Sequence, residues 1–93
     1  MKVTLDVPDY DPYHGVLSVW DNDYVIDVKI AHQAVYVYGN KPALISLARL
    51  LLALAQDAVP AGSHIHLDSF HDLDPGSDEI VFGKIKDKLS SAT

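Results

Sequence analysis

Residues 34–58 read AVYVYGNKPALISLARLLLALAQDA, and this stretch decides the fold because its hydrophobic period changes within it. Residues 34–38 are rich in β-branched and aromatic side chains, which is typical of a strand. Asn40 can act as a helix N-cap, and Pro42 fits the first helical turn, where its missing N–H is not needed. Over residues 43–58 the leucines and alanines recur at helical spacing. The sequence therefore predicts a strand followed directly by a helix.

The predicted helix carries few polar residues. They form one thin stripe, which we expect to face solvent with Arg49 at its tip, and which consists of Ser46, Arg49, Gln56 and Asp57. Leucine, isoleucine and alanine occupy most of the remaining surface. A helix this apolar is covered on more than one side. It either lies across a curved sheet or also meets a second protomer.

Hydrophobic alternation predicts further strands on both sides of the helix. The expected strands are residues 3–7, 15–20, 24–31 and 34–38 before it, and 64–68 and 79–85 after it. Reversals are expected at the turn residues 21–23 and at His32-Gln33. The predicted class is α+β: a mainly antiparallel sheet of about six strands in the order ββββαββ, with one long apolar helix packed on one face. Residues 1–89 should form a single domain, and residues 90–93 a frayed tail.

Composition narrows the functional classes. The 93-residue chain carries 13 acidic and 7 basic residues, for a net charge of −6, which argues against nucleic-acid binding and suits a basic protein partner. It contains no cysteine, so thiolate metal sites and a cysteine nucleophile are excluded, and a reducing, cytoplasmic location is expected. The longest apolar stretch, residues 42–55, is too short for a bilayer, so no membrane partner is expected.

One cluster of side chains could hold a metal. On a strand, His64, His66 and Asp68 project from one face, and His71 could return from the following loop to complete a site for Zn²⁺ or another divalent ion. The plainer interpretation places these imidazoles on the wet face of a sheet, with Asp68 beginning the loop. A nucleophile elbow and a glycine-rich phosphate loop are both missing. We therefore predict no catalytic residues, no cofactor and no enzymatic activity.

Six amphipathic aromatic residues lie among aspartates in the first forty positions. Aromatic side chains with an acidic rim are typical of a protein-binding hot spot, although tyrosines also cap core edges with their hydroxyls in water. The predicted partner-binding residues are Tyr10, Tyr13, Trp20, Asp21, Asp23, Tyr36 and Tyr38.

A leucine-rich helix followed by a distinctive signature gives the chain a family likeness. The signature is Gly-Ser-His-Ile-His-Leu-Asp at 62–68, then Leu73 and Gly76-Ser77, then an apolar strand at 80–82. Over roughly residues 36–84 the chain resembles the bacterial Immunity protein 32 (Imm32) family of polymorphic-toxin systems. The resemblance implies a small α+β antitoxin that binds a cognate secreted toxin in the cytoplasm of the producing cell.

The resemblance supplies family-signature positions without roles, and these are His64, His66, Asp68, Gly76 and Ser77. Three functional hypotheses stand beside one another. The first is a non-catalytic antitoxin with a basic toxin as its partner. The second is a metal-binding protein or enzyme that uses the histidine-rich strand. The third is a module that homodimerises through the apolar helix or an open strand edge.

Overall fold

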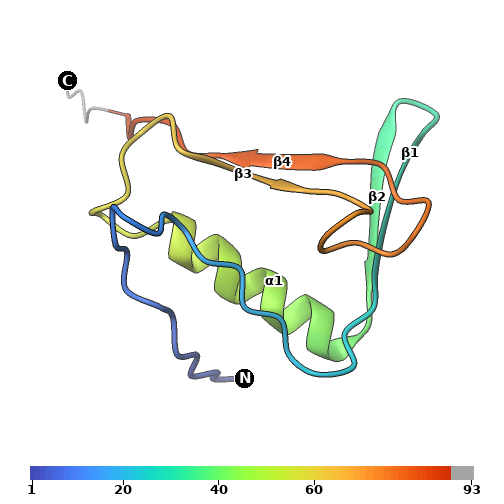
Figure 1. The fold of residues 1–93 in the computed structure, drawn as a ribbon, viewed down its shortest axis with the longest axis horizontal. Helices are drawn as coiled ribbons and strands as arrows, with labels where there is room; N and C mark the ends of the chain where they lie inside the picture. The colour runs from blue at the N-terminus through green and yellow to red at the C-terminus, as the bar shows by residue number, and fades with distance from the viewer. Residues whose placement is uncertain (89–93) are drawn as a thin grey trace.

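The computed structural model describes residues 1–88, in which one helix and four strands alternate with irregular segments (Figure 1). In chain order the elements are β1 (Ile26–Ala31), β2 (Ala34–Gly39), α1 (Lys41–Leu54), β3 (His64–Leu67) and β4 (Ile80–Gly83). β1 pairs with β2 and β3 with β4, both antiparallel. The α+β class is therefore confirmed. The single six-stranded sheet is wrong, because the described strands form two separate two-stranded sheets.

The two hairpins and α1 enclose the core between them. The β3–β4 hairpin passes over α1, and the β1–β2 hairpin stands at the end where α1 begins (Figure 1). Ile26 and Val28 alternate along β1 and turn the same face inward, where Leu50 of α1 meets them. Leu67 of β3 and Leu73 of the following loop close the core from the other side. Side chains alternate between the two faces of a strand, so Ile26 and Val28 share the buried face of β1.

The predicted strands at residues 3–7 and 15–20 do not form. A single isolated bridge between Asp11 and Gly15 is the only strand-like pairing in this part of the described chain. Alternation makes a strand only where another strand offers a free edge, and this segment instead lies along α1. The backbone N–H of Asp21 donates to Ser46 Oγ (2.9 Å), and Gln56 Nε2 donates to the carbonyl oxygen of Pro8 (2.9 Å).

Three of the four residues of the predicted polar stripe, Ser46, Arg49 and Gln56, bind the N-terminal segment instead of facing solvent, which corrects the prediction, whereas Asp57 is exposed as expected. Ser46 is only 1% exposed, and its hydroxyl also donates to the Pro42 carbonyl. Arg49 reaches Asp21 at 3.1 Å and the Val19 carbonyl at 3.4 Å. These side chains anchor an irregular segment whose backbone has no sheet to bond to, so the polar residues lie where hydrogen-bonding partners are needed.

The ends of several elements differ from prediction. Asn40 caps α1 as expected, with its Oδ1 accepting from the Ala43 N–H at 3.1 Å. The helix ends at Leu54, four residues before the predicted end, and Lys84 Nζ binds the carbonyls of Gln56 and Val59 just beyond. The predicted strands at 24–31, 64–68 and 79–85 are shorter than expected at their ends. Residues 86–88 have no helical turn, and the predicted tail at 90–93 lies outside the described residues.

The β1–β2 turn is a two-residue reversal at the predicted place. His32 and Gln33 both have positive φ, at 52° and 62°. This is the backbone geometry of a tight hairpin turn, in which Asn-Gly is the favoured pair. Separately, none of the helices in residues 1–88 is both long and apolar enough to cross a bilayer.

Candidate partner-binding surface

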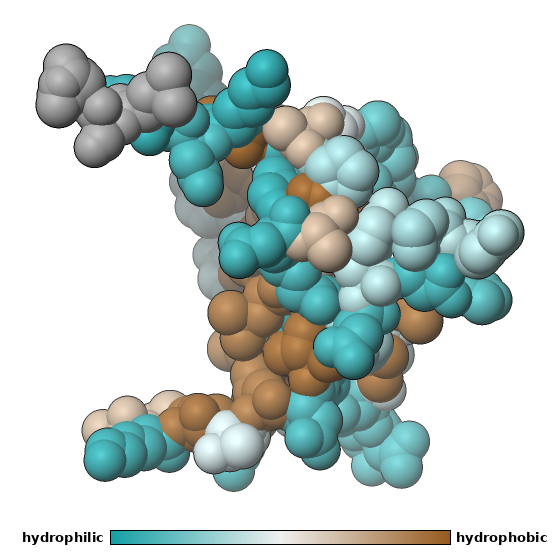
Figure 2. All heavy atoms as spheres, turned by 90° about the vertical axis from the view of Figure 1, so that its left-hand side faces the viewer, coloured by the Kyte–Doolittle hydropathy of each residue, from teal (hydrophilic) through white to brown (hydrophobic). Residues whose placement is uncertain are grey.

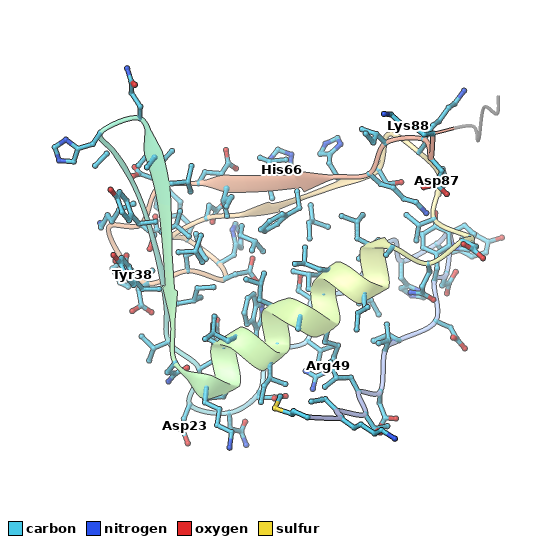
Figure 3. The ribbon with its side chains drawn as sticks, turned by 180° about the vertical axis from the view of Figure 1, so that it is seen from behind. Asp23, Tyr38, Arg49, His66, Asp87 and Lys88 are labelled. Atoms are coloured by element: carbon cyan, nitrogen blue, oxygen red, sulfur yellow. The ribbon has the colours of Figure 1, made fainter. Side chains whose placement is uncertain are left out.

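The outer face of the β1–β2 hairpin carries a stacked pair of exposed aromatic side chains. Tyr36 and Tyr38 alternate on β2 with Val37, which packs against the core, so both tyrosines point away from the core. They are 37% and 64% exposed, and their rings stack with centroids 6.3 Å apart and planes 6° from parallel. Figure 3 shows Tyr38 directed away from α1, at the side of the molecule. We call Tyr36 and Tyr38 the tyrosine pair.

Charged residues of β1 lie directly across from the tyrosine pair. In the strand register Asp27 is opposite Tyr38 and Lys29 is opposite Tyr36. The ammonium of Lys29 is engaged by the Gly76 carbonyl and lies 3.9 Å from the Asp27 carboxylate. Lys29, the cation that the strand register places on this face, is therefore already bound within the protein. The stacked aromatic surface remains available to a partner.

A loop covers the outer edge of β1 and completes this surface. We call residues 74–78 the edge loop. Its polar groups bond four backbone groups of β1: Asp74 N–H to Ile26 O (2.8 Å), Asp78 N–H to Val28 O (2.8 Å), Val28 N–H to Ser77 Oγ (3.2 Å) and Ile30 N–H to Asp78 Oδ2 (2.7 Å). A strand edge is a row of unpaired backbone groups, and the edge loop satisfies this row with side chains as well as backbone.

The edge loop explains two of the signature residues. Gly76 adopts φ +84°, which a residue with a Cβ rarely adopts, and its carbonyl receives Lys29. Ser77 Oγ accepts from the Val28 N–H and donates to Asp27 Oδ1 at 2.8 Å. Both residues therefore have a structural role, because they bind β1 and hold in place the strand that lies beside the tyrosine pair.

β2 has a free edge. Among residues 1–88 its only strand neighbour is β1. Ala34, Tyr36 and Tyr38 pair with the β1 residues that do not bind the edge loop, so their backbone groups point toward β1. Backbone groups alternate in direction along a strand, so the N–H and C=O groups of Val35 and Val37 point toward the open edge. Within residues 1–88 this edge receives no covering loop. An uncharged strand edge rich in β-branched and aromatic residues can pair with a strand of another protein chain.

The predicted binding residues between positions 20 and 23 make contacts or turns within the fold. Trp20 is half-buried, stacks on Tyr24 with centroids 4.7 Å apart, and donates from Nε1 to Asp72 at 2.8 Å. Burial, with the nearby Asp72 carboxylate, raises the pKa of Tyr24. Asp21 binds Arg49, and Asp23 forms a turn at φ 63°. Figure 3 places Asp23 near the start of α1, away from Tyr38.

The N-terminal segment that carries Tyr10 and Tyr13 lies at the other end of the molecule from the β1–β2 hairpin (Figure 1). Tyr13 is 95% exposed, and its N–H donates to Asp11 Oδ1 at 2.9 Å. This bond, with one from His14, lowers the pKa of Asp11. Tyr10 is half-buried and lines an open pocket of about 400 Å³ with residues from β3. The seven predicted binding residues thus do not form one continuous surface.

The histidine-rich strand does not gather its side chains into one site. His64 and His66 both lie on the outer face of β3, with ring centroids 5.0 Å apart, and Figure 3 shows His66 on the side away from α1. His66 Nδ1 lies 3.1 Å from Glu79, whereas Asp68 lies 2.9 Å from His71. Residues 1–88 contain no group of three or more His, Cys, Asp or Glu side chains arranged to hold a metal ion.

Asp68 begins the β3–β4 loop, as the plainer interpretation expected. Its Oδ1 accepts from the Phe70 N–H at 2.9 Å, and its carbonyl receives the N–H groups of the next turn. The hydrogen bond from His71 lowers the pKa of Asp68, and the same bond raises the pKa of His71. Both side chains face water, so this pair shapes a loop on the surface.

Comparison with known proteins identifies one family. A model of the family described as Immunity protein 32 matches residues 34–85, from the start of β2 to just beyond β4. The matched region holds β2, α1, β3, the edge loop and β4, and therefore includes the tyrosine pair. No curated protein and no solved structure matches the chain significantly.

Proposed function

Because the chain belongs to the Immunity protein 32 family, we propose that it is an antitoxin that binds a cognate bacterial toxin and blocks it without catalysis. Membership of this family supports the proposed class of function, that of an antitoxin. The tyrosine pair, exposed on β2 within the matched region, supports the location that we propose for the binding surface. We propose this surface as the centre of the toxin interface.

The tyrosine pair has the properties of an interface hot spot. Tyrosine buries a large area with few rotatable bonds, and its hydroxyl can replace a hydrogen bond to water. Stacking of Tyr36 on Tyr38 already fixes both rings, so little further conformational entropy is lost when a partner covers them. The ladder to β1 and the edge loop hold the strand beneath them in place.

Charge favours a basic partner for this surface. The net charge of the chain is −6, and the carboxylates of Asp27 and Asp78 flank β1 beside the tyrosine pair. Acidic surfaces accelerate the encounter with a basic protein. A toxin that cleaves nucleic acid needs a basic site for phosphates, and an acidic protein seated over that site would exclude its substrate. We therefore propose a basic toxin, met in the cytoplasm before it is secreted.

Co-expression tests this proposal. Each candidate toxin gene that adjoins the gene for this chain is expressed alone and together with it, and growth and co-purification are measured. We expect growth to be restored and a complex to be recovered. The Tyr36→Ala/Tyr38→Ala variant should weaken binding by about 30-fold or more, the size of a hot-spot loss of about 2 kcal/mol.

Tyr13→Ala is the matched control, because Tyr13 is also an exposed tyrosine but belongs to the N-terminal segment at the far end of the molecule. It should bind the toxin as the unaltered chain does. Thermal unfolding of all variants separates lost binding from lost folding. If no adjoining toxin is neutralised, the antitoxin role is refuted. If neutralisation survives in the double tyrosine variant, only the proposed location is wrong.

A further inference from the structure

The solvent-facing side of α1 is apolar, which is the reverse of an ordinary surface helix. The exposed helical positions after Lys41 are Leu44, Ala48, Leu51 and Leu52, and Ala55 at the C-cap continues them. Their spacing places them on one side of the helix. The three leucines are 50%, 38% and 50% exposed. We call these five residues, from Leu44 to Ala55, the outer stripe.

Nothing else in residues 1–88 covers the outer stripe. The N-terminal segment crosses α1 on the side seen in Figure 1, where Ser46 and Arg49 bind it, and the opposite side faces the viewer uncrossed in Figure 3. Figure 2 views the molecule from the left-hand side of Figure 1 and shows apolar side chains gathered over the lower half of this end, below a hydrophilic upper part. The polar residues of α1 that follow Lys41, namely Ser46 and Arg49, make internal contacts and do not lie on the outer stripe.

The chain also exposes more surface than a monomer of its size. Its accessible area is 6865 Å², whereas about 5,300 Å² is expected for a folded monomer of 10.2 kDa. Its radius of gyration is 14.8 Å, against about 12 Å expected. The extended N-terminus contributes to this excess. The whole difference, the N-terminus included, is larger than the roughly 800 Å² that each partner buries in a standard interface.

We infer that the outer stripe binds the outer stripe of a second copy of this chain, so that two α1 helices pack antiparallel across a two-fold axis near Ala48. This axis places Leu44 of one copy against Leu52 of the partner copy, with the small Ala48 side chains at the crossing. Large and small residues then alternate in each helix and interdigitate.

Charge favours a second copy over the toxin as the occupant. Two chains of charge −6 can bring these stripes together because no acidic residue lies within either one. Antiparallel pairing moves Lys41 of each copy toward the end where Asp57 of the partner copy is exposed. Permanent homodimer interfaces are the more apolar class, whereas a steered antitoxin interface uses charge. The dimer leaves the tyrosine pair free, because Tyr38 points to the side in Figure 3.

Sedimentation equilibrium of the full chain tests the inference directly. We expect a mass of about 20 kDa, twice the 10.2 kDa of one chain. Leu44→Glu should shift the chain to monomer, because two carboxylates would then enter an apolar interface. Leu17→Glu is the matched control: Leu17 is 46% exposed but lies in the N-terminal segment, and this variant should remain a dimer.

Cross-linking gives a readout that does not depend on the stability of a variant. The chain has no cysteine, so Ala48→Cys introduces a single thiol at the proposed axis. Mild oxidation at low micromolar concentration should convert it to a disulfide-linked dimer. Ala31→Cys, an exposed alanine at the tip of the β1–β2 hairpin, should stay largely uncrosslinked.

A native chain that stays monomeric at all concentrations, with no excess cross-linking at position 48, overturns the inference. It is also overturned if the native chain is monomeric and Leu44→Glu abolishes toxin neutralisation, since the toxin would then occupy the stripe. Failure of the co-expression test with a dimer present would refute only the antitoxin role.

Discussion

Ser77 offers the sharpest test of how the edge loop holds the β1–β2 hairpin. Its hydroxyl accepts the Val28 N–H at 3.2 Å and donates to Asp27 Oδ1 at 2.8 Å. Val28 is completely buried, so Ser77→Ala leaves an unpaired amide that water cannot reach. A buried donor without a partner costs about 1–3 kcal/mol, and we expect a loss near the middle, about 2 kcal/mol. For a domain of this size the melting temperature should fall by about 8–16 °C.

Urea unfolding measures the free-energy change, and hydrogen exchange localises it. The Val28 amide should lose about 30-fold in protection, the exchange equivalent of 2 kcal/mol. Ser18→Ala is the control, because Ser18 is exposed in the N-terminal segment and should change stability by less than about 0.5 kcal/mol. A Ser77→Ala variant as stable as the Ser18→Ala variant, with Val28 still protected, would refute the structural role assigned to this signature residue.

Three further outcomes follow from local geometry. Replacing His32-Gln33 by Asn-Gly should stabilise the chain by about 1–2 kcal/mol, because both positions have positive φ; an unchanged denaturation midpoint would contradict this. Asn40→Ala should destabilise it by about 1–2 kcal/mol in thermal unfolding, because the Asn40 side chain caps α1 and also bonds the backbone before β1; an effect below 0.5 kcal/mol would exclude that double role. Asp68→Asn should lower the pKa of His71, measured by NMR titration, toward its ordinary value of 6.5, with the other histidine resonances unaffected. The contribution of His71 to stability is present below pH 6.5 and is lost as the pH rises through its raised pKa. The contribution of Asp68 is present above pH 3.8 and is lost as the pH falls through its lowered pKa. A His71 titration that is identical in the variant and the unaltered chain would disprove the pairing.

The strand predicted at residues 34–38 implies that Tyr36 and Tyr38 share a face, because side chains on a strand alternate whatever the strand packs against. The sequence could not show that the segment with Tyr10 and Tyr13 lies at the opposite end of the molecule, since the distance between segments depends on how the chain returns. The contact between Ser77 and Val28 joins residues 49 positions apart, and a serine after glycine in a polar loop gives no sign of it.

The amino-acid sequence by itself determined the helix with its Asn40 cap, the two-residue reversal at His32-Gln33 and the inward face of β1 at Ile26 and Val28, because these depend on backbone preference and hydrophobic period within a few residues. Only the tertiary structure decided that the alternating N-terminal segment would find no sheet edge. It also decided that the polar side of α1 would bind that segment and leave the leucines facing outward. The polarity of a side chain determines whether it needs a hydrogen-bonding partner or an apolar neighbour. Which residue provides that contact depends on how distant parts of the chain come together.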